Sequence, residues 1–155
     1  MKIQVINGPN LNMLGKREPK LYGKLTLTEI NRVLMEEGKK NNVELLFFQS
    51  NHEGAIVDCI HDCNEYADAI IINPAAYTHY SIAIRDAIAS ISVPVVEVHL
   101  TKIDEREEFR KISVTKDVCK AQFYGKGIGS YLEAISYFIK QQNTLKKKEN
   151  TDDKK

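Results

Sequence analysis

Apolar residues in this chain gather in short uninterrupted runs, with amphipathic stretches between them. The runs are rich in Val, Ile and Phe, a pattern typical of strands that are buried on both faces of a parallel sheet. They lie at Ile3–Ile6, Val43–Phe48, Ala69–Ile72, Val95–Val98 and, less clearly, Ala121–Tyr124. We therefore predict five strands in one parallel sheet, with helices between them.

Signals for helix starts fall between these runs. In a capping box, a Ser or Thr stands three positions before a Glu, and the two residues cap the first turn of a helix; Asp is a looser match at the first position. The matching tetrads are Thr26–Glu29, Ser50–Glu53, Asp104–Glu107 and Ser130–Glu133. Strands that alternate with helices favour right-handed crossovers. The prediction is an α/β flavodoxin-like three-layer fold with a five-stranded parallel sheet in the order 2-1-3-4-5.

Length and composition predict one folded domain. A chain of 155 residues forms a core without disulfide or metal staples. Its hydrophobic fraction of 43% and charged fraction of 28% are ordinary for a globular protein. We expect a single α/β domain over residues 1–142 and a charged, disordered tail over residues 143–155, because the tail has almost nothing to bury.

Charge and hydropathy argue against several kinds of partner. A formal net charge of +1 gives no reason to expect nucleic acid or an acidic membrane, and no apolar run approaches membrane-spanning length. The N-terminus enters a strand-like segment without the basic and apolar regions of a secretory signal. The expected location is therefore cytoplasmic.

The cysteines do not indicate a disulfide framework or a metal site. There are three, Cys59, Cys63 and Cys119, an odd and small number. Cys59 and Cys63 are four residues apart and share one helix face, whereas His61 points elsewhere. A metal site needs more converging ligands than this. We predict buried, reduced thiols and no bound metal.

Polar side chains follow three of the predicted strands. In open α/β sheets, ligands bind at the carboxyl ends of the strands near the switch in strand order, here between strands 1 and 3 with strand 4 beside them. The residues expected to gather there are Asn10, Asn73, His79 and His99. His52 follows the outer strand 2 and should lie further away. Glu97 lies two positions before His99, so it shares one face of the strand and can orient or charge the imidazole.

Ordinary structural roles compete with these interpretations. An Asn after a strand often caps the next turn, and we prefer that interpretation for Asn7 and Asn51. Asn73 precedes Pro74, which holds it extended and can aim its amide into the crevice. A single His is usually a structural residue, but two of four at one crevice exceed that expectation.

Two further segments have a structural and a functional interpretation. Gly125-Lys-Gly-Ile-Gly129 has the glycines of a phosphate loop but lacks the Lys-Ser/Thr ending, so we prefer a strand-to-helix turn. The segment EREEFRK fits a solvated helix face. Arg106 and Arg110 nevertheless have i,i+4 spacing, and one of them can reach an anionic or polyhydroxy ligand.

Residues 7–23, NGPNLNMLGKREPKLYG, form an unusually long loop. Its three glycines and two prolines prevent a regular helix or strand. Loops of this length are usually lids, binding loops or disordered segments. This one carries Arg17 and Tyr22 next to the crevice. The residues alone indicate proton transfer on a small, polar, anionic molecule, without a nucleophile elbow or a cofactor fingerprint.

Four segments resemble, in order and spacing, the type II 3-dehydroquinate dehydratases. They are INGPNLNMLGKREPKLYG, QSNHEG, INPAAYTHYSIAIRDA and EVHLTKIDEREEFRKIS. The likeness runs from residue 2 to about residue 113 and resumes at the glycine turn, whereas residues 114–124 match poorly. The resemblance implies a flavodoxin-like hydro-lyase that converts 3-dehydroquinate to 3-dehydroshikimate through an enolate. It also implies the shikimate pathway to chorismate and aromatic amino acids, no metal or cofactor, and a dodecamer made of trimers.

The resemblance assigns roles by position. Tyr22 would be the base and Arg17 its partner, on a lid with Gly15 and Gly23 as hinges. His99 would be the general acid with Glu97 behind it, and Asn10 would hold a water that stabilises the enolate. The substrate-binding residues implied are Asn73, His79, Asp86, Leu100, Thr101 and Arg110, with Asp86 reaching the site of a neighbouring subunit.

Two other classes of function compete with the dehydratase. One is a flavodoxin-like binding module without activity, against which the intact set of Tyr22, Arg17 and His99 argues. The other is a cofactor-free isomerase or hydrolase that acts on a different polyhydroxy acid. Dehydration of added 3-dehydroquinate separates these possibilities.

Overall fold

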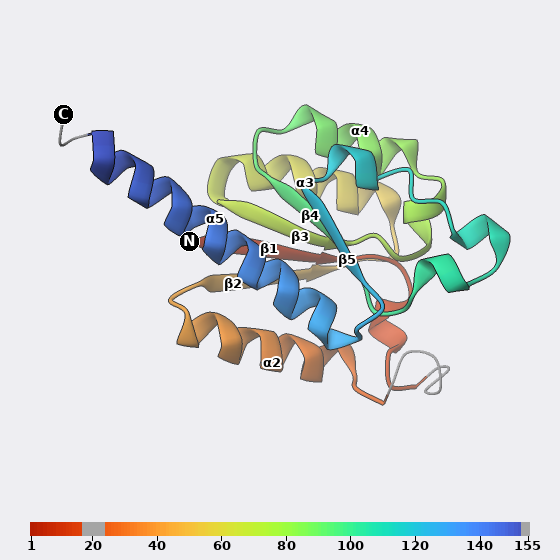
Figure 1. Ribbon diagram of the computed structural model, residues 1–155. Coiled ribbons are helices and arrows are strands. Elements are labelled where there is room, and N and C mark those ends of the chain that lie inside the picture. The colour runs from red at the N-terminus through yellow and green to blue at the C-terminus, as the bar shows by residue number, and fades with distance from the viewer. Residues whose placement is uncertain (17–23, 153–155) are drawn as a thin grey trace.

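A five-stranded parallel sheet forms the centre of the molecule in the computed structural model, which describes residues 1–16 and 24–152 (Figure 1). The strands are β1 (Lys2–Asn7), β2 (Glu44–Gln49), β3 (Ala69–Asn73), β4 (Val95–His99) and β5 (Ala121–Tyr124). All neighbours pair in parallel, in the order β2-β1-β3-β4-β5. The predicted fold class and strand order are therefore confirmed.

Helices cover both faces of the sheet and bury two apolar layers (Figure 1). The α-helices are α2 (Leu27–Lys40), α3 (Glu53–Tyr66), α4 (Ile82–Ser90) and α5 (Ile128–Asp152). Helices α2 and α5 pack on one face over Ile3, Val5 and Ile71, whereas α3 and α4 pack on the other over Ile6, Ile70 and Ile72. The single-turn 3-10 helices are η1 (Leu11–Met13), η2 (Ala75–His79), η3 (Ile103–Glu105), η4 (Glu108–Arg110) and η5 (Lys116–Val118).

One of the four predicted capping boxes is present. The Thr26 hydroxyl accepts the Glu29 N–H at 3.2 Å, and the Glu29 carboxylate accepts the Thr26 N–H at 2.7 Å. At α3 the prediction was wrong, because Ser50 instead accepts the N–H of His52 and the N-cap is His52. Glu53 is occupied by a tertiary contact, since the Ser81 hydroxyl donates to its carboxylate at 2.5 Å.

The other two predicted helix starts were also wrong. Residues 104–107 do not open an α-helix but lie across the separate turns η3 and η4. Helix α5 begins at Ile128, so Ser130 is inside the helix and fully buried. Ser130 instead accepts the N–H of Lys126 at 3.3 Å, from within the turn before the helix.

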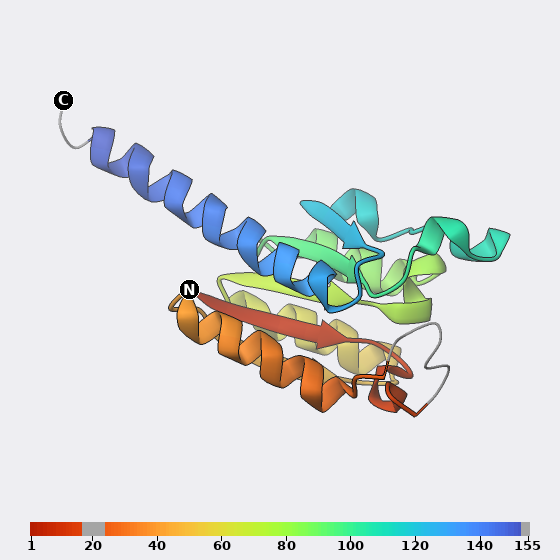
Figure 2. The same cartoon turned by 60° about the horizontal axis from the view of Figure 1, so that its bottom comes forward.

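The C-terminal segment differs from the expected disordered tail, because α5 continues to Asp152. Figures 1 and 2 show this part of the helix extending past the edge of the sheet. Its contacts with the apolar layer end near Ile139, and residues 143–148 are exposed. Lys, Glu and Gln are good helix formers, so the helix can continue without a core beneath it. None of the helices in the described ranges is long and apolar enough to cross a membrane.

The ends of β1 and β3 approach closely at Gly8. Its N–H donates to the Asn73 carbonyl at 2.8 Å. A Cβ atom at this position would lie 2.4 Å from the carbonyl oxygen of Pro74, so no side chain fits without moving the backbone. Gly8 therefore permits the strand spacing on which the cavity described below depends.

Gly8→Ala should lower the free energy of unfolding by roughly 1–3 kcal/mol or more, because the added methyl group forces β1 and β3 apart. Gly54→Ala is the matched control. Its Cβ would meet nothing within 4 Å inside α3, so it should be neutral or stabilise by up to about 1 kcal/mol. Urea unfolding of both variants measures the difference. Equal effects would show that the approach at Gly8 is not tight.

Candidate active site

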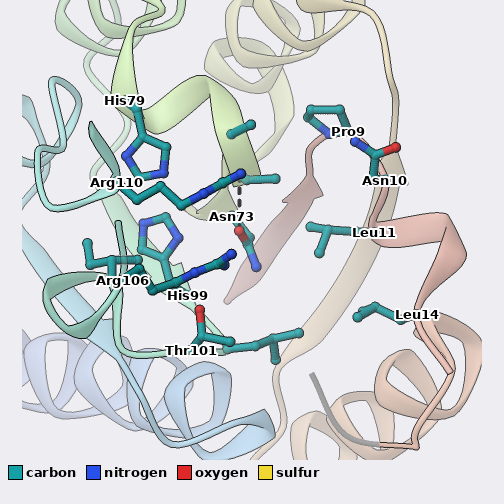
Figure 3. A pocket seen from close by; sticks show the side chains of 14 residues that line it. Pro9, Asn10, Leu11, Leu14, Asn73, His79, His99, Thr101, Arg106 and Arg110 are labelled. Carbon is teal, nitrogen blue, oxygen red and sulfur yellow. Dashed lines mark hydrogen bonds between the residues drawn. The ribbon is translucent and has the colours of Figure 1, made fainter. Parts of the chain in front are cut away.

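A cavity opens at the carboxyl ends of β1, β3 and β4, where the strand order switches (Figure 3). About 680 Å³ of empty space lies in and in front of it, open solvent included. Its polar lining comes from the loops that follow these strands. The residues expected from the sequence that line it are Asn10, Asn73, His79, His99, Leu100, Thr101 and Arg110.

His99, at the end of β4, is held by the carboxylate behind it. Its Nε2 lies 2.6 Å from Oε1 of Glu97, and Glu97 is completely buried. An ionised carboxylate only accepts hydrogen bonds, so Nε2 carries a proton and Nδ1 is the nitrogen left for a ligand. The predicted pairing of Glu97 with His99 is thus present in the structure.

Glu97 is surrounded by hydrogen-bond donors from three other segments. The donors are Thr78 (2.5 Å), Thr115 (2.8 Å), Ser113 (3.0 and 3.1 Å) and Gln122 (3.1 Å). We call these four residues the donor nest. Burial alone would raise the pKa of Glu97, but the hydrogen bond and charge of His99 and the hydroxyls of Thr78 and Thr115 outweigh it and lower the pKa to about 2. Glu97 is therefore a buried anion.

His79 is oriented by a backbone carbonyl. Its Nδ1 donates to the carbonyl of Ile112 at 2.7 Å, which leaves Nε2 as an acceptor when the ring is neutral. Burial lowers the pKa of His79, more than the bond to Ile112 raises it, and the nearby His99, Arg110 and Arg106 lower it further. At neutral pH, His79 is thus suited to accept a hydrogen bond from a ligand hydroxyl.

Two arginines make the cavity electropositive. Figure 3 shows Arg106 and Arg110 extending toward Asn73 from the side that holds both histidines. Each pairs with Glu107, at 3.5 and 3.3 Å. The i,i+4 spacing predicted that Arg106 and Arg110 share a helix face and that one of them reaches a ligand. In the structure they do not share a helix, yet both line the cavity. Two cationic groups favour an anionic ligand.

Asn73 is locked by a buried network across the sheet end. Its Nδ2 donates to the Tyr131 hydroxyl at 2.9 Å, and its Oδ1 accepts the N–H of Ala75 at 3.1 Å (Figure 3). The Tyr131 hydroxyl in turn donates to Asn7 at 2.6 Å. Asn7 was predicted to cap a turn, but its side-chain oxygen instead accepts this bond from Tyr131, so that prediction was wrong. Ala75 has a φ of 53°, a left-handed conformation that costs about 1 kcal/mol or more and is held by this bond.

The chain matches the family described as dehydroquinase class II over residues 1–139. It belongs to this family. The 3-dehydroquinate dehydratase of Bacillus pumilus is 51% identical over 137 residues, which is 88% of this chain and 93% of the relative. That of Bacillus mycoides is 53% identical over 134 residues, or 86% and 92%. The crystal structure of a type II dehydroquinase from Butyrivibrio crossotus has a TM-score of 0.87 and 51% identity, covering 88% of this chain and 96% of that chain.

Not every predicted site residue of this class II dehydroquinase lies at the cavity. Asp86, on α4, is exposed and pairs with Arg85 at 3.4 Å instead of lining the cavity of its own chain. Arg17 and Tyr22 lie outside the described residues. His52 is at the exposed start of α3, away from the cavity as expected.

The glycine turn before α5 packs against the cavity wall and fits the strand-to-helix interpretation. Gly127 donates its N–H to the carbonyl of Leu100 at 2.9 Å. Gly125 has a φ of 81°, and a Cβ there would lie 2.6 Å from the Lys102 side chain. Asn51 was predicted to cap the turn after its own strand, and this was wrong. Its side-chain oxygen instead accepts the N–H of Asn10 at 2.9 Å, from the loop after β1.

Sequence interpretation missed Tyr131 and the donor nest. One signal was available for Gln122, because it pairs with Glu97 in the register of β4 and β5 once the strand order is known. Thr78 lies in the short 3-10 helix η2, and Ser113 and Thr115 lie in an irregular segment, so no strand or α-helix periodicity shows the direction of these side chains. Tyr131 reads as an ordinary core position of a helix.

Tyr131→Phe should lower the free energy of unfolding by roughly 1–3 kcal/mol, because it leaves buried polar atoms of Asn7 and Asn73 without their partner. It should also raise KM for substrate, since Asn73 loses the contact that orients it. Tyr137→Phe is the control, because that ring packs against Phe123 and Phe138. Thermal or urea unfolding together with steady-state kinetics measures both effects. Unchanged stability in Tyr131→Phe would contradict the network.

Proposed function

We propose that the cavity is where this class II dehydroquinase eliminates water from 3-dehydroquinate to give 3-dehydroshikimate, the dehydration step of the shikimate pathway. The observation that carries the proposal is the pairing of His99 with buried, ionised Glu97 at the wall of an electropositive cavity. An imidazole held in this way can be protonated on both nitrogens and can present Nδ1–H to a ligand.

The chemistry needs a base at the carbon next to the ketone and an acid at the leaving hydroxyl. A base removes a proton from the carbon next to the ketone, and the electron pair moves onto the ketone oxygen to form an enolate. As the carbonyl re-forms, the C–O bond to the leaving hydroxyl breaks and its electron pair stays on that oxygen. His99 Nδ1 supplies the proton that turns hydroxide, a poor leaving group, into water.

The base in this proposal is Tyr22. A Tyr has an ordinary pKa of about 10, so the positive charge of Arg17 is needed to favour the phenolate. Asn10 holds a water that donates to the enolate oxygen as its charge develops. These roles rest on the family pattern, in which INGPNLNMLGKREPKLYG carries all three residues.

The remaining lining residues bind the substrate. Asn73 and the Leu100–Thr101 turn take the carboxylate, because they supply amide and backbone donors at the strand ends. His79 accepts from a ring hydroxyl through Nε2, and Arg110 holds a neighbouring hydroxyl. Asn73 and the Leu100–Thr101 turn lie at the ends of β3 and β4, so the sheet positions the groups that bind the carboxylate.

We infer a cytoplasmic enzyme that assembles as a dodecamer of trimers. Asp86 would serve the site of a neighbouring subunit, which suits its position on an exposed face of α4 outside the cavity of its own chain. Neither nucleic acid nor metal has a role in this proposal.

The direct experiment mixes the purified protein with 3-dehydroquinate. Near-ultraviolet absorbance should rise as the conjugated enone forms, and the product should have lost one water. Quinate is the control substrate, because without a ketone its neighbouring C–H proton is not acidic. A folded protein that gives no absorbance with 3-dehydroquinate would contradict the proposed function and favour a binding module or another isomerase or hydrolase.

A further inference from the structure

Glu97 receives more hydrogen bonds than the orientation of one imidazole requires. His99 and the four residues of the donor nest together supply five donors. A carboxylate offers about four lone-pair sites, so these five donors match or exceed the number of hydrogen bonds that Glu97 can accept. The three hydroxyl residues of the nest are closed to solvent, since Thr78, Ser113 and Thr115 are at most 5% exposed, whereas Gln122 is half-buried.

The hydroxyls of the nest are arranged to give their protons to Glu97. The oxygens of Thr78, Ser113 and Thr115 lie 2.9–3.2 Å from one another. Each hydroxyl has a single proton, and Ser113 already accepts the N–H of Lys116 at 3.0 Å. Thr78, Ser113 and Gln122 contact Oε1 of Glu97, the oxygen that His99 also contacts, and Thr115 and Ser113 contact Oε2. The arrangement therefore concentrates donor groups on this one carboxylate.

Proton donation by His99 creates an electrostatic problem at this position. Before the step, Glu97 faces an imidazolium and its charge is compensated. After His99 has passed its proton to the leaving hydroxyl, Glu97 is a completely buried anion next to a neutral ring. A buried charge that loses its partner is strongly destabilised unless other donors replace it.

We propose that Thr78, Ser113, Thr115 and Gln122 are positioning residues that stabilise the Glu97 charge left uncompensated when His99 gives up its proton. This rests on the proposed function, in which His99 is the general acid. The nest stabilises the Glu97 anion more when His99 is neutral than when His99 is protonated. It therefore stabilises the transition state, in which His99 is losing its proton, more than the resting enzyme.

Other titratable and charged groups near the pair are few among the described residues. His79, Arg106 and Arg110 line the cavity with His99. Cys119 lies just before β5. Burial raises the pKa of its thiol, and the negative charge of Glu97 raises it further. The positive charges of Arg106 and Arg110 and the ring of His79 therefore share the cavity with His99.

The proposal fixes the sign of a pH effect. Loss of a nest donor destabilises the state with neutral His99 more than the state with protonated His99. The imidazole should then hold its proton more tightly, and its titration should move to higher pH. If the nest served only to keep Glu97 ionised, its loss would let Glu97 take up a proton, and the His99 titration would move to lower pH.

Thr115→Val tests this, because it removes the hydroxyl and keeps the shape, whereas Thr115→Ser keeps the hydroxyl. NMR of the histidine rings, with the His99 signal assigned by its loss in His99→Gln, gives the titration. We expect an upward shift of roughly 0.5–1 pH unit and a 3- to 10-fold fall in kcat at nearly constant KM in Thr115→Val, since bonds to charged groups are about twice as strong as neutral ones. Thr115→Ser should titrate and turn over like the wild type.

Gln122→Met provides a second test at the sheet edge if Thr115→Val does not fold, with a smaller change in the same direction. A downward shift, no shift, or an upward shift without a fall in kcat would each overturn the proposal. The titration does not depend on turnover. Wild-type protein that fails to dehydrate 3-dehydroquinate would therefore refute the proposed function separately from the response of His99 to its surroundings.

Discussion

His99→Gln is expected to lower kcat by roughly 10²- to 10⁴-fold, the range that a positioned general acid contributes. Glutamine can still donate an N–H toward Glu97, but it has no proton to give to the leaving hydroxyl. KM should change little, because the proposed function gives the carboxylate and hydroxyl contacts to other lining residues, Asn73, His79 and Arg110. Steady-state kinetics with 3-dehydroquinate measures both constants.

The matched control for this variant is His61→Gln. His61 is exposed on α3 and does not line the cavity, so its replacement should leave kcat, KM and stability unchanged. A His99→Gln enzyme that keeps more than about a tenth of wild-type kcat would exclude His99 as the acid.

Glu97→Gln should lower the free energy of unfolding at neutral pH by roughly 3–5 kcal/mol, the usual cost of breaking a buried ion pair from one side. The amide keeps the size of the side chain but turns one acceptor into a donor. That donor then faces hydroxyls that already point their protons at this position. Turnover should fall as well, because His99 loses the charge that favours its protonated form.

The stability difference should depend on pH in a defined direction. Glu97 has its folded pKa lowered to about 2, below the ordinary value of about 4.3. Its contribution is therefore fully present above about pH 5 and is lost progressively as the pH falls toward 2. The gap between wild type and Glu97→Gln, measured by urea unfolding, should narrow from pH 7 to pH 3. Glu36→Gln, at an exposed position of α2, should show no gap at either pH.

Most of the fold and much of the site could be predicted from the sequence, because both depend on hydrophobic patterns and strand geometry that can be recognised in short segments. Uninterrupted apolar runs locate the strands, and the parallel order then brings the loops after β1, β3 and β4 to one cavity. Glu97 and His99 share a strand face because of the two-residue period of a strand. Each of these inferences uses geometry that does not depend on long-range detail.

The errors have a common physical origin. The tetrads that begin at Ser50 and Ser130 contain the residue types of a capping box. In the structure, however, the Glu53 carboxylate accepts a hydrogen bond from Ser81, the N-cap residue of α4, and Ser130 is buried within α5. The donor nest joins η2, the segment before η5 and β5, so only the folded chain shows it. Contacts between distant segments override local preference and leave no local pattern to read.

The most direct measurement of the central claim is the initial rate of enone formation from 3-dehydroquinate by wild type, His99→Gln and His61→Gln, compared at equal concentration and confirmed fold. We predict that wild type and His61→Gln dehydrate the substrate at equal rates, while His99→Gln is slower by at least about a hundredfold. Equal rates for all three proteins, or no reaction with any of them, would contradict the assignment of this cavity as a dehydratase site.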